Sequence, residues 1–314
     1  LVGSEMCIRD RPEQMVIDGN FPTVVSPNPE NPEGFYLAID LAKKNDVDFI
    51  LGTDPDSDRV GIMVRNHEGE FQPVTGNQTG VLMLDYLIGA MRRAGKLPEH
   101  PYFLKTIVTT EMARKVAEAN GVTCCDTFTG FKFMAEKKNE LEGQGKGQII
   151  MSYEESYGYL AGPYVRDKDA VIGSMLICEM AAYYRSIGSS IKQRLEEIYA
   201  QNGRYLNKVD SFEFPGLTGM EKMASIMQKL RDEPLTEMAG HKVVKVTDYK
   251  KPEDTGLPAA NVLIYSLDNG ATVVVRPSGT EPKIKTYFTT LGKDLAEAQA
   301  QKDALAAAIE PILK

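Results

Sequence analysis

The chain has 314 residues, of which 42% are hydrophobic and 25% charged, so it has the composition of an ordinary globular protein and the length for two or three domains. Its net charge of -8 argues against nonspecific nucleic-acid binding, and no apolar run reaches the roughly 18 residues that a membrane span requires. The four cysteines show neither zinc-site nor disulfide spacing. We therefore expect a cytoplasmic protein without a signal peptide, with no nucleic-acid or membrane partner.

The first part of the chain has the pattern of an incomplete α/β unit. Residues 1–12 show no periodicity and are interpreted as a foreign leader. A helix is predicted near 35–44 and a strand over the apolar run 46–51. Because the earlier strands of such a unit do not occur in the sequence, residues 13–66 are interpreted as the C-terminal part of a domain that is truncated.

The turn that follows this strand is the most distinctive stretch of the sequence. Asp54, Asp56 and Asp58 stand at alternate positions where a strand ends, which is where open α/β sheets usually bind ligands. Pro55 biases the preceding residue away from helical geometry. Three carboxylates so placed repel one another unless a divalent cation lies between them, and ligation by oxygen alone suits Mg²⁺. Arg59 would suit a phosphate bound at that metal.

Three rival interpretations of this turn were weighed. An EF-hand loop requires Gly at its sixth position and Glu at its twelfth, where this chain has Arg59 and Arg65, so that interpretation is excluded. A phosphatase that forms an aspartyl-phosphate would use Asp54 as nucleophile and Asp56 as acid, although a third Asp at the fifth position is unusual there. A solvated acidic turn without a metal is a common feature. The last two alternatives remain open.

Strands and helices alternate over residues 67–203, which predicts one α/β domain. A strand at 148–153 delivers the segment Glu154-Glu155-Ser156-Tyr157-Gly158 at its end. The Gly-rich stretch 143–147 precedes a strand instead of opening a helix, so it is interpreted as a surface connection. Helices are predicted over 79–94, 111–119 and 170–186, and the last carries Ile172, Met175, Leu176, Met180 and Tyr183 as candidate core residues.

Residues 204–314 change to a strand-rich pattern, which predicts a smaller α+β domain. A tight turn interrupts its strands at Arg276, Ser278, Gly279 and Thr280. A guanidinium, two hydroxyls and a backbone that permits close approach are the donors that a phosphate needs. A plain β-turn explains the same composition equally well. Strands are expected over 243–247, 261–266, 271–275 and 284–289, and a final helix over 295–309.

Two further sets of polar residues are candidates for chemistry. Glu154 and Ser156 could both address sugar hydroxyls, because a carboxylate accepts hydrogen bonds while a hydroxyl donates and accepts them. A capping pair is the alternative. Lys168, between Asp167 and Asp169, has the pattern of a surface charge run. A lysine near phosphate and metal could also transfer a proton or neutralise charge.

Taken together, these loops resemble those of the α-D-phosphohexomutases, the family of phosphoglucomutases and phosphomannomutases. Five motifs occur in that family's order across nearly the whole chain after residue 12, and their agreement is far more specific than any one of them. They are Thr53-Asp54-Pro55-Asp56-Ser57-Asp58-Arg59, Thr129-Gly130-Phe131-Lys132, Glu154-Glu155-Ser156-Tyr157-Gly158, Arg166-Asp167-Lys168-Asp169 and Arg276-Pro277-Ser278-Gly279-Thr280-Glu281-Pro282.

The resemblance implies α/β domains with mixed sheets, followed by a smaller α+β C-terminal domain similar to the TATA-box-binding protein. It also implies a phosphoserine that gives its phosphate to one end of the sugar phosphate, after which the bisphosphate reorients and returns the other phosphate. The roles that it implies near the metal are Mg²⁺ ligation for Asp54, Asp56 and Asp58, a catalytic place close to the phosphoserine for Arg59, and acid–base catalysis for Lys168. For the substrate, it implies recognition of sugar hydroxyls by Glu154 and Ser156, lining of the site by Thr129, Gly130 and Lys132, and binding of the nonreacting phosphate by Arg276, Ser278, Gly279 and Thr280.

The sequence departs from this family at the nucleophile. The family's serine lies in a loop of the form Thr-Ala-Ser-His-Asn-Pro, whereas the nearest match here, Ser26-Pro27-Asn28-Pro29, lacks the His. We therefore expect that the first domain and part of the second are missing and that this chain alone is inactive. The predicted function is interconversion of glucose 1-phosphate and glucose 6-phosphate by the parent enzyme. A noncatalytic sugar-phosphate-binding remnant and a mutase of mannose or pentose phosphates are the alternatives.

Overall fold

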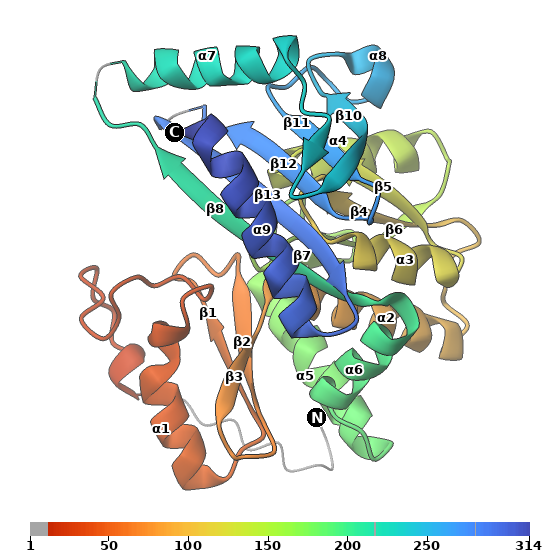
Figure 1. The fold of residues 1–314 in the computed structure, drawn as a ribbon. Helices are drawn as coiled ribbons and strands as arrows, with labels where there is room; N and C mark the ends of the chain where they lie inside the picture. Colours follow the sequence, from red (N-terminus) through yellow and green to blue (C-terminus); the bar gives the residue numbers. More distant parts are fainter. Residues whose placement is uncertain (1–11, 217, 280) are drawn as a thin grey trace. The chain divides into compact units, whose positions relative to one another are not determined.

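The computed structural model describes residues 12–216, 218–279 and 281–314, which form two compact units. One unit contains the chain up to Thr109 together with Val116–Leu195, and the other contains Thr110–Lys115 together with Glu196–Lys314. Figure 1 shows the elements of both, coloured along the sequence. Among the helices of the described residues, none has both the length and the apolar composition to cross a membrane.

The first unit begins with a small antiparallel sheet of three strands in the order β1-β2-β3. The acidic turn joins β1 to β2, and Gly52 pairs with Gly61 beside it. The turn thus leaves the end of a strand, as predicted, but it does so within an antiparallel hairpin. Its residues are too few for a parallel crossover, which takes a dozen or more. The elements are η1 (Pro12–Gln14), η2 (Pro32–Phe35), α1 (Tyr36–Asn45), β1 (Phe49–Thr53), β2 (Val60–Arg65) and β3 (Phe71–Val74).

A second sheet of the same unit has the order β5-β4-β6-β7. β4 is parallel to β5 and β6, whereas β7 is antiparallel to β6, so the predicted mixed α/β sheet is confirmed. No strand was predicted from the sequence at the position of β7. Its strands are β4 (Pro101–Thr106), β5 (Thr123–Thr127), β6 (Gln148–Glu154) and β7 (Gly158–Ala161), and the further helices wholly within this unit are α2 (Gly76–Arg93), α4 (Phe131–Gly143) and α5 (Ala170–Ser186). The division between the units falls within α3 (Glu111–Ala119) and α6 (Ile191–Asn202).

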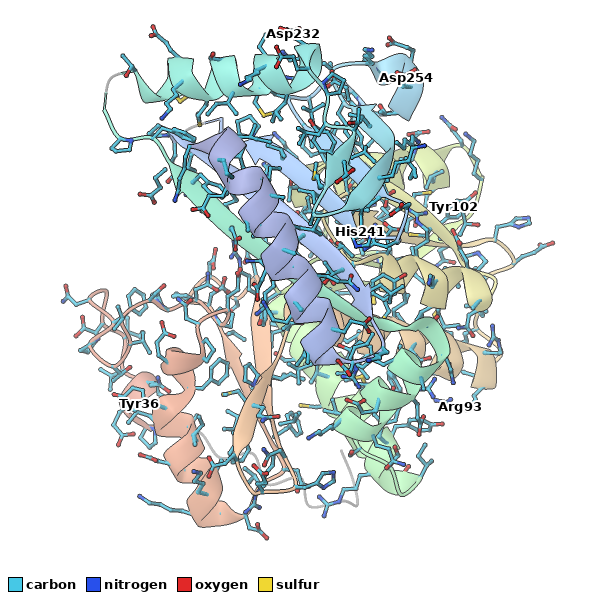
Figure 2. All side chains as sticks on the ribbon, in the orientation of Figure 1. Tyr36, Arg93, Tyr102, Asp232, His241 and Asp254 are labelled. Atoms are coloured by element: carbon cyan, nitrogen blue, oxygen red, sulfur yellow. The ribbon has the colours of Figure 1, made fainter. Side chains whose placement is uncertain are left out.

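The ends of two helices show how local signals fix this region. α2 starts earlier than predicted because Thr75 and Gln78 form a capping box, in which each side chain accepts a hydrogen bond from the other residue's backbone N–H. α5 has the predicted bounds, and Asp169 caps its first N–H groups. Met175 on this helix is 53% exposed, so its assignment to the core is wrong. Figure 2 labels Arg93 at the end of α2, where its guanidinium lies 4.2 Å from the Tyr183 ring centroid.

The second unit contains an antiparallel sheet with the order β8-β13-β12-β11-β10-β9, which confirms the predicted α+β domain. Figure 1 shows α9 lying along β13 and β8. Its core includes Val273 and Phe288 from the sheet and Leu305 from α9. The elements are β8 (Arg204–Glu213), α7 (Gly219–Asp232), β9 (Glu237–Met238), β10 (His241–Asp248), α8 (Pro252–Thr255), β11 (Leu263–Leu267), β12 (Thr272–Pro277), β13 (Lys283–Gly292) and α9 (Leu295–Leu313).

Candidate active site

The acidic turn between β1 and β2 is folded by its own first aspartate. One carboxylate oxygen of Asp54 accepts the backbone N–H of Asp58 at 3.0 Å and that of Arg59 at 2.9 Å. The Ser57 N–H donates to the Asp54 carbonyl at 3.1 Å, and Ser57 itself has φ 56°. These bonds curl the backbone so that carboxylates at alternate positions face the same region.

The three aspartates converge, as the sequence analysis predicted. Asp54, Asp56 and Asp58 each offer a carboxylate oxygen, and these oxygens all lie within 4.8 Å of one another. The Oδ1 atom of Asp58 is buried and makes no hydrogen bond within the described part of the chain. Burial, opposed by two backbone hydrogen bonds and reinforced by the neighbouring Asp58, raises the pKa of Asp54 above its usual 3.8. An unsatisfied oxygen and crowded negative charge are both features that a hard divalent cation would relieve, so the set fits Mg²⁺.

Arg59 lies beside these carboxylates. Its Nε lies 3.7 Å from a carboxylate oxygen of Asp54 and 3.6 Å from one of Asp58, and its terminal nitrogen donates to Glu30 at 3.0 Å. The arginine side chain stays 34% exposed. A pocket of about 300 Å³ opens here, lined by Ser26, Pro27, Asn28, Asp54, Pro55, Asp56, Asp58 and Arg59.

Backbone hydrogen bonds join this turn to two other loops of the same unit. Val60 N–H donates to the Tyr157 carbonyl at 3.1 Å, and Arg59 pairs with Gly158 in an isolated antiparallel β-bridge. Ala170 N–H, at the start of α5, donates to the Ser57 carbonyl at 2.9 Å. The turn is therefore fixed to the segment after β6 and to the start of α5, which are distant from it in sequence.

Lys168 contacts the acidic turn directly. Its Nζ lies 2.8 Å from Asp58 Oδ2 and 3.3 Å from Asp167, and the side chain is only 15% exposed. It is therefore no solvated surface lysine. Burial alone would lower the pKa of Lys168, but its hydrogen bonds to the two aspartates and their charges raise it above 10.5, so the lysine is protonated. Gly158 leaves room for it, because a Cβ there would lie 2.3 Å from Lys168 Cδ.

Glu154 is the last residue of β6 and is buried, being 6% exposed. Its Oε1 accepts the Gly130 N–H at 2.5 Å, which brings the predicted sugar segment and the 129–132 segment together. Burial raises the pKa of Glu154 above its usual 4.5, although the Gly130 N–H, Lys168 and Arg59 act in the opposite direction. Among the other predicted residues here, Thr129 and Ser156 are partly exposed, whereas Lys132 is exposed with its Nζ 5.0 Å from the Phe133 ring centroid.

The predicted phosphate turn belongs to the second unit, where it connects β12 to β13. Its local contacts follow the hairpin: Ser278 N–H donates to Lys283 O at 2.8 Å, and Arg276 donates to the Tyr287 hydroxyl at 3.5 Å. Gly279 is exposed, and Thr280 lies outside the described residues. The roles assigned to this turn stay predictions.

Sequence reasoning missed two carboxylates of the first unit. Glu30 pairs with Arg59, but an isolated Glu in a Pro-rich loop carries no pattern that would indicate this. Glu155 was quoted within a motif without a role, yet its Oε2 accepts hydrogen bonds from Thr106 and Thr109. Consecutive residues at a strand end face opposite ways, and that signal could have separated Glu155 from Glu154.

Solved structures of low sequence identity share this fold. A phosphoglucomutase/phosphomannomutase family protein from Burkholderia thailandensis superposes with a TM-score of 0.65 at 16% identity, with 94% of this chain and 53% of that chain covered. The open form of pp63/parafusin, a phosphoglucomutase from Paramecium, gives a TM-score of 0.63 at 21% identity, with 91% of this chain and 49% of that chain covered.

Curated relatives are closer in sequence. A phosphoglucomutase from Staphylococcus epidermidis is 39% identical over an alignment of 295 residues, with 91% of this chain and 53% of that protein covered. One from Staphylococcus aureus is 39% identical over an alignment of 282 residues, with 87% of this chain and 50% of that protein covered. The chain thus spans about half the length of these relatives.

Three family models match successive parts of the chain. Domain II of the phosphoglucomutase/phosphomannomutase family, described as alpha/beta/alpha, matches residues 5–69, and alpha/beta/alpha domain III matches residues 75–202. The family's C-terminal domain matches residues 224–308. The first match begins inside the segment interpreted as a leader, and the domain boundaries drawn from the sequence remain predictions. By these three matches, together with the curated relatives, the chain belongs to the phosphoglucomutase/phosphomannomutase family.

Proposed function

We propose that this chain carries the metal, sugar and acid–base part of a phosphoglucomutase, an isomerase that interconverts glucose 1-phosphate and glucose 6-phosphate. The observation that carries this proposal is the junction of three loops, in which the acidic turn is bonded to the Glu154–Gly158 segment and to the start of α5 beside Lys168. Metal ligands, a buried carboxylate and a protonated amine within one unit are the groups that phosphoryl transfer to a sugar hydroxyl uses. A cytoplasmic location, inferred from cysteine usage, belongs to the same proposal.

The residues divide the work by their chemistry. Asp54, Asp56 and Asp58 would hold Mg²⁺, which when bound supplies positive charge against the transferring phosphoryl group. Arg59 presents a partly exposed guanidinium beside them, suited to phosphate oxygens. Lys168 holds a proton at Nζ, 2.8 Å from Asp58, and can give it to a sugar oxygen as a general acid.

The sugar would be read by the segment after β6. Glu154 keeps one oxygen on the Gly130 N–H, which orients the carboxylate toward the cationic side of the site. Ser156 is partly exposed two residues later. Hydrogen bonds to sugar hydroxyls from both would select the sugar, and the names of the 39% identical relatives favour glucose. Thr129 and Lys132 would line the sugar site beside Gly130. Binding of the nonreacting phosphate would fall to Arg276, Ser278, Gly279 and Thr280.

Isothermal titration of the 314-residue chain tests this function. We expect Mg²⁺ to bind, and Asp58→Asn to weaken its affinity by about tenfold or more because a ligand charge is lost. Asp40→Asn is the matched control, since Asp40 is an exposed aspartate on α1 of the same unit. In the presence of Mg²⁺, glucose 1-phosphate should bind more tightly than mannose 1-phosphate or ribose 1-phosphate.

Two results would contradict the proposal. Equal Mg²⁺ affinity of Asp58→Asn and Asp40→Asn would refute the proposed metal site. Equal affinity for the three sugar phosphates would refute the preference for glucose. A coupled assay for glucose 6-phosphate should detect no turnover by the 314-residue chain alone, because no Thr-Ala-Ser-His-Asn-Pro segment occurs in it.

A further inference from the structure

Three side-chain oxygens form a closed triangle beneath the predicted sugar segment. Glu155 Oε2 lies 3.1 Å from Thr106 Oγ1 and 3.2 Å from Thr109 Oγ1, and the two hydroxyl oxygens lie 2.8 Å apart. Both threonines are buried, with exposed fractions of 0% and 3%. This triangle links the end of β4 to the residue that follows β6, and the proposed function gives it no task.

A buried lysine makes the threonine side of the triangle rigid. Lys105 is 0% exposed, and its Nζ donates to the carbonyls of Thr106 at 3.4 Å and Thr109 at 3.1 Å. The same Nζ pairs with Asp126 on β5 at 3.0 Å. The Thr109 N–H also donates to the Thr106 carbonyl at 3.0 Å. The backbone that carries the two hydroxyls is therefore held by contacts other than those with Glu155.

The neighbouring carboxylate, Glu154, has a different set of partners. Its Oε1 accepts the Gly130 N–H at 2.5 Å, and the charges of Lys168 and Arg59 act on it. Because Glu155 directly follows Glu154 at the end of β6, fixing the Glu155 carboxyl on the two threonines restricts the backbone that carries Glu154. The segment has little freedom to adjust otherwise, since a Cβ at Gly76 would lie only 2.0 Å from the Glu155 carbonyl oxygen.

We propose that Glu155 is a positioning residue, whose carboxyl group is anchored on Thr106 and Thr109 and thereby holds Glu154 against the Gly130 N–H. On the proposed function, the same anchor orients the carboxylate that reads the sugar hydroxyls. Glu155 does not itself touch the sugar.

The anchor depends on hydrogen-bond acceptance and not on charge. The two threonine hydroxyls can each donate their proton to the Glu155 oxygen, so the anchor needs an acceptor at that atom. Burial and the adjacent charge of Glu154 raise the pKa of Glu155, whereas the hydrogen bonds from Thr106 and Thr109 act in the opposite direction. Glutamine, which keeps an acceptor oxygen at the same reach, should therefore replace Glu155, whereas alanine should not.

Amide hydrogen exchange at Gly130 tests this role without any ligand. In Glu155→Ala we expect exchange of the Gly130 amide to accelerate by about tenfold or more, because Glu154 leaves its acceptor position. Glu155→Gln should restore the slow exchange. Glu179→Ala is the matched control, since it removes a carboxylate that accepts a hydrogen bond from the Tyr86 hydroxyl at 2.6 Å in the same unit; it should leave the Gly130 rate unchanged.

A merely structural role would give a different result. If Glu155→Ala lowered the melting temperature but left the Gly130 amide as protected as in the wild type, the proposal would be overturned. Should Glu155→Ala fail to fold, the double variant Thr106→Val and Thr109→Val keeps the volume and removes only the donors, and it must accelerate the same amide.

The readout separates this inference from the proposed function. Gly130 exchange is measured on the free chain, so it decides the role of Glu155 even if glucose 1-phosphate does not bind. If the sugar phosphate does bind, Glu155→Ala should weaken that affinity by about tenfold and Glu155→Gln by much less. Unchanged affinity alongside faster Gly130 exchange would keep the positioning role and refute its link to the sugar.

Discussion

Three carboxylates of the first unit and one of the second are held in opposite ways. In the first unit burial raises the pKa of Asp54, Glu154 and Glu155 above the usual values. In the second unit Asp248 is also partly buried, which by itself would raise its pKa, but hydrogen bonds from Arg231 and from the Lys250 N–H lower it below 3.8. Asp248 thus has its counter-ion within the chain, whereas the three carboxylates of the first unit are destabilised as anions.

On the proposed function, this difference separates a structural carboxylate from a functional one. A group that only supports the fold gains by being paired, as Asp248 is by two hydrogen bonds of 2.9 and 3.1 Å from Arg231. Perturbed carboxylates that cluster near Lys168 and Arg59 are instead the pattern expected of a site that receives a ligand.

The largest expected effect comes from removing the partner of Asp248. Arg231→Met leaves the Asp248 charge in a partly buried position without its partner, and should lower the free energy of unfolding by about 3 kcal/mol. Arg185→Met is the matched control, because its pair with Asp48 joins side chains that are 83% and 70% exposed and should change stability by less than about 1 kcal/mol. Urea denaturation measures both. Equal losses would show that burial does not set the value of these pairs.

Mg²⁺ should stabilise the first unit by neutralising the carboxylates of the acidic turn. At about 100 times its dissociation constant, a ligand that binds only the folded state adds about 2.7 kcal/mol of stability. We expect this gain in the first unit, measured by hydrogen exchange of β1 and β2, and no gain in the second unit. Sodium chloride at the same ionic strength controls for screening. A gain that persists in Asp58→Asn would show that the ion binds elsewhere.

Local patterns in the sequence predicted much of this comparison. The Asp-x-Asp-x-Asp spacing led to a cluster whose oxygens lie within 4.8 Å, because the turn is short enough for its own backbone to fold it. The bounds of α3 and α5 were predicted to the residue, since Asn120-Gly121 and Asp169 are strong terminal signals.

Contacts between distant segments could not be predicted in the same way. The bond from Ala170 to Ser57 and the pair between Arg59 and Glu30 depend on how separate segments pack. The antiparallel character of the acidic turn was missed because a strand followed by a turn reads alike in both sheet types until its partner is known. Glu155 was overlooked for the same reason, since its threonine partners lie 46 and 49 residues away.

The stability contributed by Glu155 and that contributed by Asp248 should change in opposite directions with pH. Because its pKa is raised, the folded state keeps its proton while the unfolded state ionises near 4.5. Stability from this group is therefore complete below pH 4.5 and is lost as the pH rises toward the folded value. Asp248, with its lowered pKa, contributes above 3.8 and loses its contribution as the pH falls.

Substitution should isolate the Glu155 part of this response. Glu155→Gln cannot ionise, so its stability relative to the wild type should grow between pH 4.5 and 8, on the order of 1 kcal/mol. Asp248→Asn should instead approach the wild type below pH 4. Chemical denaturation at each pH measures both trends. A constant difference for Glu155→Gln would show that its carboxyl titrates alike in the folded and unfolded states.

The smallest effect is the most informative about cost. Asp54→Asn keeps the oxygen that accepts the Asp58 and Arg59 N–H groups but removes a charge that burial and Asp58 disfavour. Without metal, this variant should be more stable than the wild type by about 0.5 kcal/mol. With saturating Mg²⁺ the order should reverse, because the wild type gains a ligand that the variant binds poorly. Calorimetry of the variant and the wild type, with and without MgCl₂, measures the stability difference under both conditions. A variant that is less stable in both conditions would mean that the Asp54 charge supports the turn itself, and the acidic turn would then resemble Asp248 rather than differ from it.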